Sequence, residues 1–109
     1  MKIDAVRRHA LGLPEVVEQP HFHYASFRVA GKIFVTVPPE QTHIHVFVSE
    51  LERDRALAVH AAFVERLLWG GKVVGLRIEL KAAPAASVKH LVEQAWAAKA
   101  PKRLLAGPR

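Results

Sequence analysis

Two pairs of histidines carry the most recognisable chemistry in the sequence. His21 and His23, and again His43 and His45, are separated by one residue. Because side chains alternate across a β-strand, each pair would place two imidazoles on one face, as in sites for zinc or a related cation. No carboxylate-rich loop accompanies either pair, and the chain has no cysteine. We therefore expect exposed histidines on a strand surface, with a metal site as the less favoured alternative.

Residues that could act in catalysis are few. Ser49 and Ser87 precede helix-like segments and suit N-terminal caps, whereas Ser26 has no nucleophile-elbow sequence around it. Glu15 and Glu18 lie three residues apart beside a proline, where a solvated turn is more common than a paired acid and base. The sequence therefore favours a protein that is not an enzyme and needs no cofactor.

The stretch LLWGGKVVGLRIEL, residues 67–80, raises the question of a phosphate-binding loop. A Walker-type loop needs a lysine followed by serine or threonine, and a dinucleotide fingerprint needs three spaced glycines between a strand and a helix. Gly70 and Gly71 instead lie between two strand-like runs, where both can adopt the positive φ of a hairpin turn. The pattern predicts a turn. Gly75, within the second run, indicates a bulge or the close approach of another backbone.

Positive charge is in excess over the chain. Lysine and arginine number 16 and acidic residues 10, a net charge of +6 that favours nucleic acid, acidic lipid or acidic protein, or only solubility. On the predicted outer sheet face, basic and aromatic residues alternate, and these can neutralise phosphates and stack on bases. The expected nucleic-acid contacts are Arg28, Lys32, Lys72, Arg77, Lys81, Lys99, Lys102 and Arg103, and the expected aromatic face is Tyr24, Phe34 and Phe47.

Two functions remain open on this pattern. In the first, the protein binds DNA mainly through phosphates, with little sequence specificity. In the second, the outer aromatic face docks a protein partner, a second copy of the chain or a small ligand, because a half-exposed aromatic face is commonly covered by something.

Alternating patterns predict five strands. Two runs within HFHYASFRVAGKIFVTVPPE meet at Val29-Ala30-Gly31, for which we predict a three-residue loop. Further strands are predicted over residues 42–48, 63–69 and 72–80. In the predicted hairpin register the core side carries Ala25, Phe27, Ile33, Val35 and Val37, and the outer side carries Tyr24, Ser26, Arg28, Lys32, Phe34 and Thr36.

Three helices complete the predicted elements. They cover residues 2–11, residues 50–62 after a Ser49 cap, and residues 87–99 after a Ser87 cap. Residues 101–109 follow as a basic, flexible tail. The order α-β-β-β-α-β-β-α with short turns predicts an α+β fold, in which helices cover one face of an antiparallel sheet. A length of 109 residues suits one domain over 1–109.

The sequence offers no sign of a membrane or secretory protein. The N-terminal MKIDAVRRHALGL is interrupted by charges where a signal peptide would be apolar. No apolar run approaches the ~20 residues that span a bilayer. The absence of cysteine is compatible with a reducing compartment, so we expect a cytoplasmic protein with no membrane partner.

Four segments occur in a familiar order: LGLPEVVEQPHF, SFRVAGKIF, WGGKVVGLRIEL and LVEQAWAAKAPKRL. Together they resemble the MmcQ/YjbR family of small bacterial proteins over nearly the whole chain. Leu13-Pro14 with Glu18 resembles the early LPG-x-x-E element of the family, and Lys32 matches the lysine of its GK hairpin. Val16 stands where the family often has glycine. The resemblance implies a double-wing α+β fold and a DNA-binding role that rests on fold analogy.

Overall fold

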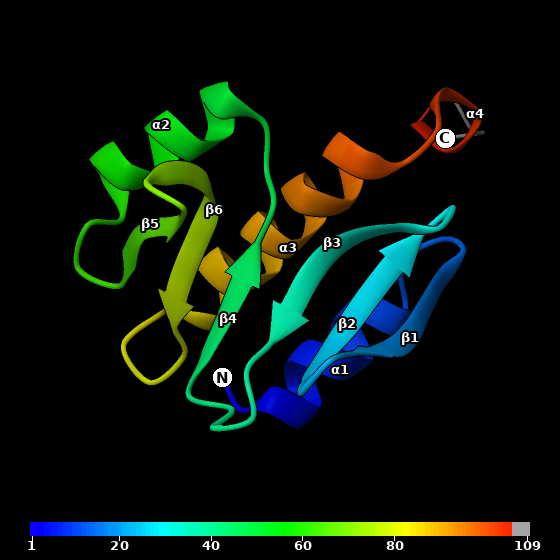
Figure 1. The fold of residues 1–109 in the computed structure, drawn as a ribbon, viewed down its shortest axis with the longest axis horizontal. Helices are drawn as coiled ribbons and strands as arrows, with labels where there is room; N and C mark the ends of the chain where they lie inside the picture. The colour runs from blue at the N-terminus through cyan, green and yellow to red at the C-terminus, as the bar shows by residue number, and fades with distance from the viewer. Residues whose placement is uncertain (106–109) are drawn as a thin grey trace.

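The computed structural model of the protein describes residues 1–105, and residues 106–109, the end of the predicted tail, lie outside the described part. Six strands form one sheet in the order β1-β2-β3-β4-β6-β5, with every neighbouring pair antiparallel (Figure 1). The strands are β1 (Val16–His21), β2 (Tyr24–Val29), β3 (Lys32–Val37), β4 (His43–Val46), β5 (Val64–Trp69) and β6 (Lys72–Glu79), and the helices are α1 (Ile3–Leu11), α2 (Glu50–Val59), α3 (Ala85–Lys99) and α4 (Lys102–Leu105).

The helices are distributed unevenly around the sheet. In Figure 1, α1 and α3 lie behind the sheet and α2 lies at the upper left beside β5 and β6, which leaves the front of the central strands free of helices. The apolar face of α3 buries Val88, Leu91, Val92 and Ala95 against the sheet. The predicted α+β class is therefore confirmed, with a helix-covered face and an open face.

The strand β1 is absent from the predicted order. Residues 16–21 pair with β2 over their whole length, from Val16 opposite Val29 to His21 opposite Tyr24. The sequence VVEQPH does not alternate between apolar and polar, and Pro20 argues against a central strand. An edge strand tolerates proline because one of its sides has no partner. The sheet therefore has six strands, and our prediction of five was wrong.

The hairpin between β2 and β3 also differs from the prediction. Its loop is Ala30-Gly31, with φ of 50° and 79°, and Val29 pairs directly with Lys32. A bulge then inserts one extra residue into β3 between the partners of Phe27 and Arg28. The predicted inward side of Ala25, Phe27, Val35 and Val37 is correct.

The bulge exchanges the environments of the two residues that it contains. Phe34, predicted on the outer face, is fully buried in the core, and Ile33, predicted in the core, is half-buried and outside the core cluster. A strand with one extra residue loses strict alternation of its side chains at that point. The faces that we predicted from alternation for Ile33 and Phe34 are therefore wrong.

Of the two predicted helix caps, one is correct and the other is wrong. Ser49 accepts a hydrogen bond from the Glu52 backbone N–H at 3.3 Å, as the capping pattern predicts. The last long helix begins at Ala85 with Pro84 in the capping position, because the Pro84 carbonyl already accepts from the backbone N–H groups of Ser87 and Val88. Ser87 therefore belongs to the first turn and is not the cap.

Candidate nucleic-acid interface

A row of paired residues crosses the open face of the sheet. Ser26 lies opposite Thr36, Thr36 opposite His45, His45 opposite Arg77, and Arg77 opposite Glu65. Partners that are directly opposite share a face, so this row extends over β2, β3, β4, β6 and β5. The sequence placed Ser26, Thr36, His45 and Arg77 on the outer face, and the pairing confirms all four positions.

Beside this row lies a hollow that we call the aromatic cleft. It consists of two adjoining cavities of about 360 and 200 Å³, which share His21, Thr36 and Trp69 in their walls. None of the described residues that line it is acidic. Its full lining is His21, Phe22, Tyr24, Ile33, Thr36, Phe47, Trp69 and Lys99.

The rings of the cleft come from both halves of the sheet. The centroids of Phe47 and Trp69 are 5.9 Å apart, and those of His21 and Phe22 are 4.8 Å apart with the rings edge to face. Tyr24 and Phe47 were predicted on this face. Phe22 and Trp69 were not predicted there, although the sequence shows one aromatic residue within the first hairpin turn and one directly before the second.

Gly75 makes room for one wall of the cleft. A Cβ atom at this position would lie 2.7 Å from the carbonyl oxygen of Val46 and 3.1 Å from the Phe47 ring. Real Cβ atoms do not approach a backbone oxygen so closely, so only glycine lets the ring of Phe47 rest on β6. The predicted close approach at Gly75 is confirmed.

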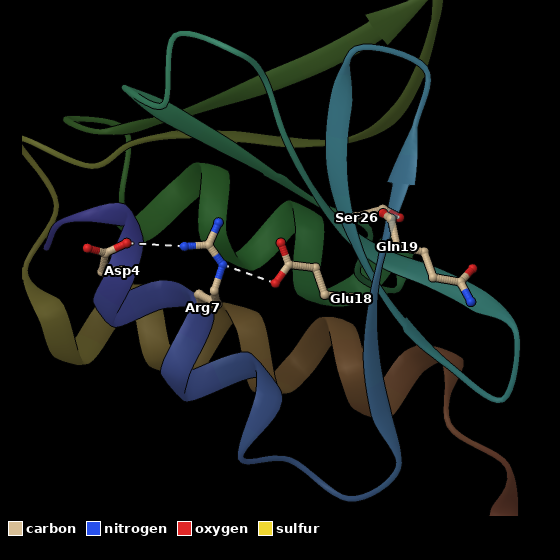
Figure 2. A network of polar contacts seen from close by, with 5 residues as sticks. All are labelled: Asp4, Arg7, Glu18, Gln19 and Ser26. Carbon is tan, nitrogen blue, oxygen red and sulfur yellow. Dashed lines mark hydrogen bonds and ion pairs between the residues drawn. The ribbon is translucent and has the colours of Figure 1, made fainter.

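The opposite wall depends on β1, which polar contacts fasten to the rest of the fold. Figure 2 shows Arg7 of α1 between two carboxylates, with Nε donating to Glu18 of β1 at 3.0 Å and Nη1 donating to Asp4 at 3.1 Å. The Ser26 hydroxyl donates to the carbonyl oxygen of Gln19 at 2.6 Å (Figure 2). These contacts fix both faces of the strand that ends in His21.

The segment before β1 is held by the C-terminal helices. Arg103 of α4 donates to both carboxylate oxygens of Glu15, at 2.5 and 2.7 Å, and the indole N–H of Trp96 donates to the carbonyl oxygen of Pro14 at 3.1 Å. The Arg103 hydrogen bond lowers the pKa of Glu15. Glu15 and Glu18 thus have separate arginine partners and form no acid and base pair, and residues 102–105 of the predicted tail are helical.

Two lysines lie at one end of the sheet. Lys32 and Lys72 are the first residues of β3 and β6, which run in the same direction on either side of β4. Both lie toward the same end of the sheet, because Val35 and Leu76, three and four residues further on, both pair with Val46. The register pairs of β3 with β4 are only Val35 and Thr36, and in Figure 1 β3 begins beside α4 whereas β6 begins under α2, so the two lysines lie on either side of the aromatic cleft. Both lysines are exposed and directly follow tight turns that contain glycines of positive φ.

Other cations gather at the same end. Lys99 lines the aromatic cleft together with Ile33, which is next to Lys32, and Trp69, which precedes the β5–β6 turn. Lys102 is the first residue of α4, which follows α3 (Figure 1). Arg28 lies on the outer face near the end of β2 and donates to the Ser26 hydroxyl. Within residues 1–105, these cations have no ion pair. We call this set the basic edge: Arg28, Lys32, Lys72, Lys99 and Lys102.

Three predicted contacts do not join the basic edge. Arg77 is paired with Glu65 at 2.8 Å, and Arg103 is paired with Glu15. Lys81 follows the C-terminal end of β6, which is the end of the sheet remote from Lys72. Arg77 and Arg103 are thus already neutralised by carboxylates, and Lys81 is too far from Lys72 to belong to the same set of cations.

His45 is not the exposed histidine that we expected. Only 4% of its surface is accessible, and its Nδ1 lies 3.2 Å from the Thr36 hydroxyl. Burial lowers its pKa to about 4, with smaller contributions from the positive charge of Arg77 and from His43. The ring is therefore neutral near neutral pH. Across the described chain, no group of three or more histidine and acidic residues is placed to hold a metal ion.

Comparison with known proteins places this geometry in a family. The family model for YjbR matches residues 11–98, which is most of the chain. The chain belongs to the YjbR family. The match begins at the end of α1 and includes every strand of the sheet and every residue that lines the aromatic cleft except Lys99.

A solved structure shares the fold of this YjbR-family protein. The crystal structure of Deinococcus radiodurans protein DR2400, with a domain designated DUF419, aligns with a TM-score of 0.73 at 14% sequence identity, over 87% of this chain and 75% of that chain. No curated protein sequence matches. In residues 1–105 there is no helix long and apolar enough to cross a membrane.

Proposed function

We propose that this YjbR-family protein binds DNA through backbone phosphates at the basic edge. The observation that carries the proposal is that Lys32 and Lys72, exposed and without ion pairs, begin β3 and β6 toward the same end of the sheet, with Lys99 in the cleft beside Ile33 and Trp69. Exposed lysines without ion pairs are available to neutralise phosphates and release their counterions. Contacts of this kind give affinity with little sequence information.

The proposed footprint is bounded on one side. Arg53 of α2 donates to the carbonyl oxygen of Val73, which places α2 beside the start of β6. The first turn of α2 contains Glu50 and Glu52, and these carboxylates repel a phosphate backbone. The nucleic acid therefore approaches from the open face and the α3–α4 side. The proposal is for a binding protein of the cytoplasm and not for an enzyme.

A second candidate is a docking face for a protein, favoured by the exposed rings of Phe22 and Trp69. Salt separates the two candidates, because a phosphate-bound complex weakens steeply with ionic strength and an apolar contact does not.

The test is a titration of labelled DNA, duplex and single-stranded, at ~50 and ~200 mM salt. If four lysines each neutralise one phosphate, a slope of about −0.9 per phosphate predicts roughly 150-fold weaker duplex binding at the higher salt. Lys72→Gln should reduce that slope by about 1. Lys81→Gln removes an equally exposed charge at the other end of the sheet and should leave it unchanged. Absence of binding at ~50 mM salt would reject the proposal.

A further inference from the structure

Phe22 occupies a position that its chemistry does not suit. It lies in the β1–β2 turn with φ of 58°, in the left-handed region that a bulky side chain rarely adopts, and 89% of its surface is exposed. The strained backbone and the exposed ring both cost free energy, and the fold gains no core contact in return. Such outliers concentrate at sites that bind something.

The ring of Phe22 is at the mouth of a cleft whose other aromatic residues are also accessible. Trp69 is 51% exposed on the opposite side, and Tyr24 and Phe47 complete the wall. The larger cavity of about 360 Å³ falls within the range of roughly 300–1,000 Å³ that is typical of small-ligand sites. Flat rings on several sides suit a flat ligand that stacks.

The electrostatics of the cleft indicate the charge of that ligand. Its lining has one formal charge, the ammonium group of Lys99, and the neighbouring His45 is neutral because burial lowers its pKa to about 4. Lys99 also belongs to the basic edge, so one residue joins the aromatic surface to the phosphate contacts. A ligand that joins a flat, neutral ring to an anionic group would place the ring in the aromatic cleft and the anion at the basic edge.

We propose that the aromatic cleft binds one or two unpaired bases of single-stranded DNA whose phosphates follow the basic edge. The inference rests on the proposed function and adds a preference for single strands. Bases in a duplex present no free face to Trp69 or Phe22, whereas an unpaired base can stack on them. Because every base has a π-face, this stacking requires no particular sequence.

The test compares three labelled ligands by fluorescence anisotropy at ~50 mM salt. They are an oligothymidine strand of about a dozen nucleotides, an abasic strand with the same number of phosphates, and a duplex of that length. Each is titrated with the wild type and with Trp69→Ala, Phe22→Ala and Leu68→Ala. Leu68, on the same strand as Trp69, is 56% exposed and lines neither cavity, so it is the matched control. Circular dichroism checks that each variant is folded.

We expect the thymidine strand to bind at least about fivefold more tightly than the abasic strand, as stacking of one base predicts. Trp69→Ala or Phe22→Ala should abolish that difference, and Leu68→Ala should preserve it. Equal, salt-sensitive binding of the two strands would overturn the base-binding cleft and leave the phosphate contacts standing. No binding of any ligand would overturn both proposals. Since Phe22 has almost no contact with the core, its variant remains informative if Trp69→Ala fails to fold.

Discussion

Replacing His45 by glutamine should make the protein less sensitive to acid. In the folded state, burial on the open sheet face lowers the pKa of the imidazole from 6.5 to about 4. Between these two values the unfolded chain binds a proton that the folded chain does not. Stability is therefore lost as the pH falls through 6.5 towards 4. Glutamine can keep a hydrogen bond to Thr36 and has no proton to gain.

The size of the effect follows from the two pKa values. Linkage between a pKa of 6.5 in the unfolded chain and about 4 in the folded protein gives a loss of about 2 kcal/mol between pH 7.5 and pH 5. Other ionisable groups add changes of their own, but these are common to the wild type and the variant. The wild type should therefore lose about 2 kcal/mol more than His45→Gln over this interval.

Urea unfolding at about pH 5 and about pH 7.5, at constant ionic strength, measures this difference directly. His23→Gln is the control, because it removes an exposed histidine from the β1–β2 turn and leaves the buried ring in place. It should follow the wild type. If His45→Gln loses as much stability as the wild type, the folded and unfolded states bind a proton at His45 equally well, so burial does not lower its pKa and the reasoning is refuted.

Three further predictions concern packing and charge. Gly75→Ala should destabilise the fold by about 1–3 kcal/mol, because its Cβ would collide with the carbonyl oxygen of Val46, and an unchanged urea midpoint would contradict this. Phe34→Ala should cost about 3–5 kcal/mol and Phe22→Ala within about 0.5, so equal costs would show that Phe34 is not buried in the core. Lys72→Gln should flatten the salt dependence of DNA binding by about one unit of slope, measured by titration over several salt concentrations.

Local patterns in the sequence predicted most of the elements that build the open face. The glycine pair predicted the β5–β6 turn, the capping residues predicted the start of α2, and alternation placed His45 and Arg77 correctly. Each of these features depends on a few neighbouring residues. The order of these elements predicted the α+β fold class, which the family resemblance also implied, and the lysine of the GK hairpin is exposed directly after the turn.

The errors arise where distant segments decide the outcome. Nothing near Val16 shows that β2 offers a free edge, so β1 could not be seen. The bulge that buries Phe34 is set by the pairing of β2 with β3, and one extra residue reverses the face. Arg103 was expected to be free, but Glu15, which neutralises it, is 88 residues away in sequence. The cleft joins turns that are far apart along the chain, so its composition required the structure.

The proline within β1 has a consequence for how copies of the protein meet. A sheet edge with free N–H and C=O groups can add a strand from another molecule, and repeated additions produce fibres. Pro20 lacks an N–H group, so a strand added to β1 would lose one backbone hydrogen bond near the end of this strand. This edge is thereby protected from extension by a neighbouring chain, which favours solubility at high concentration. The proline therefore disfavours association of two copies through β1.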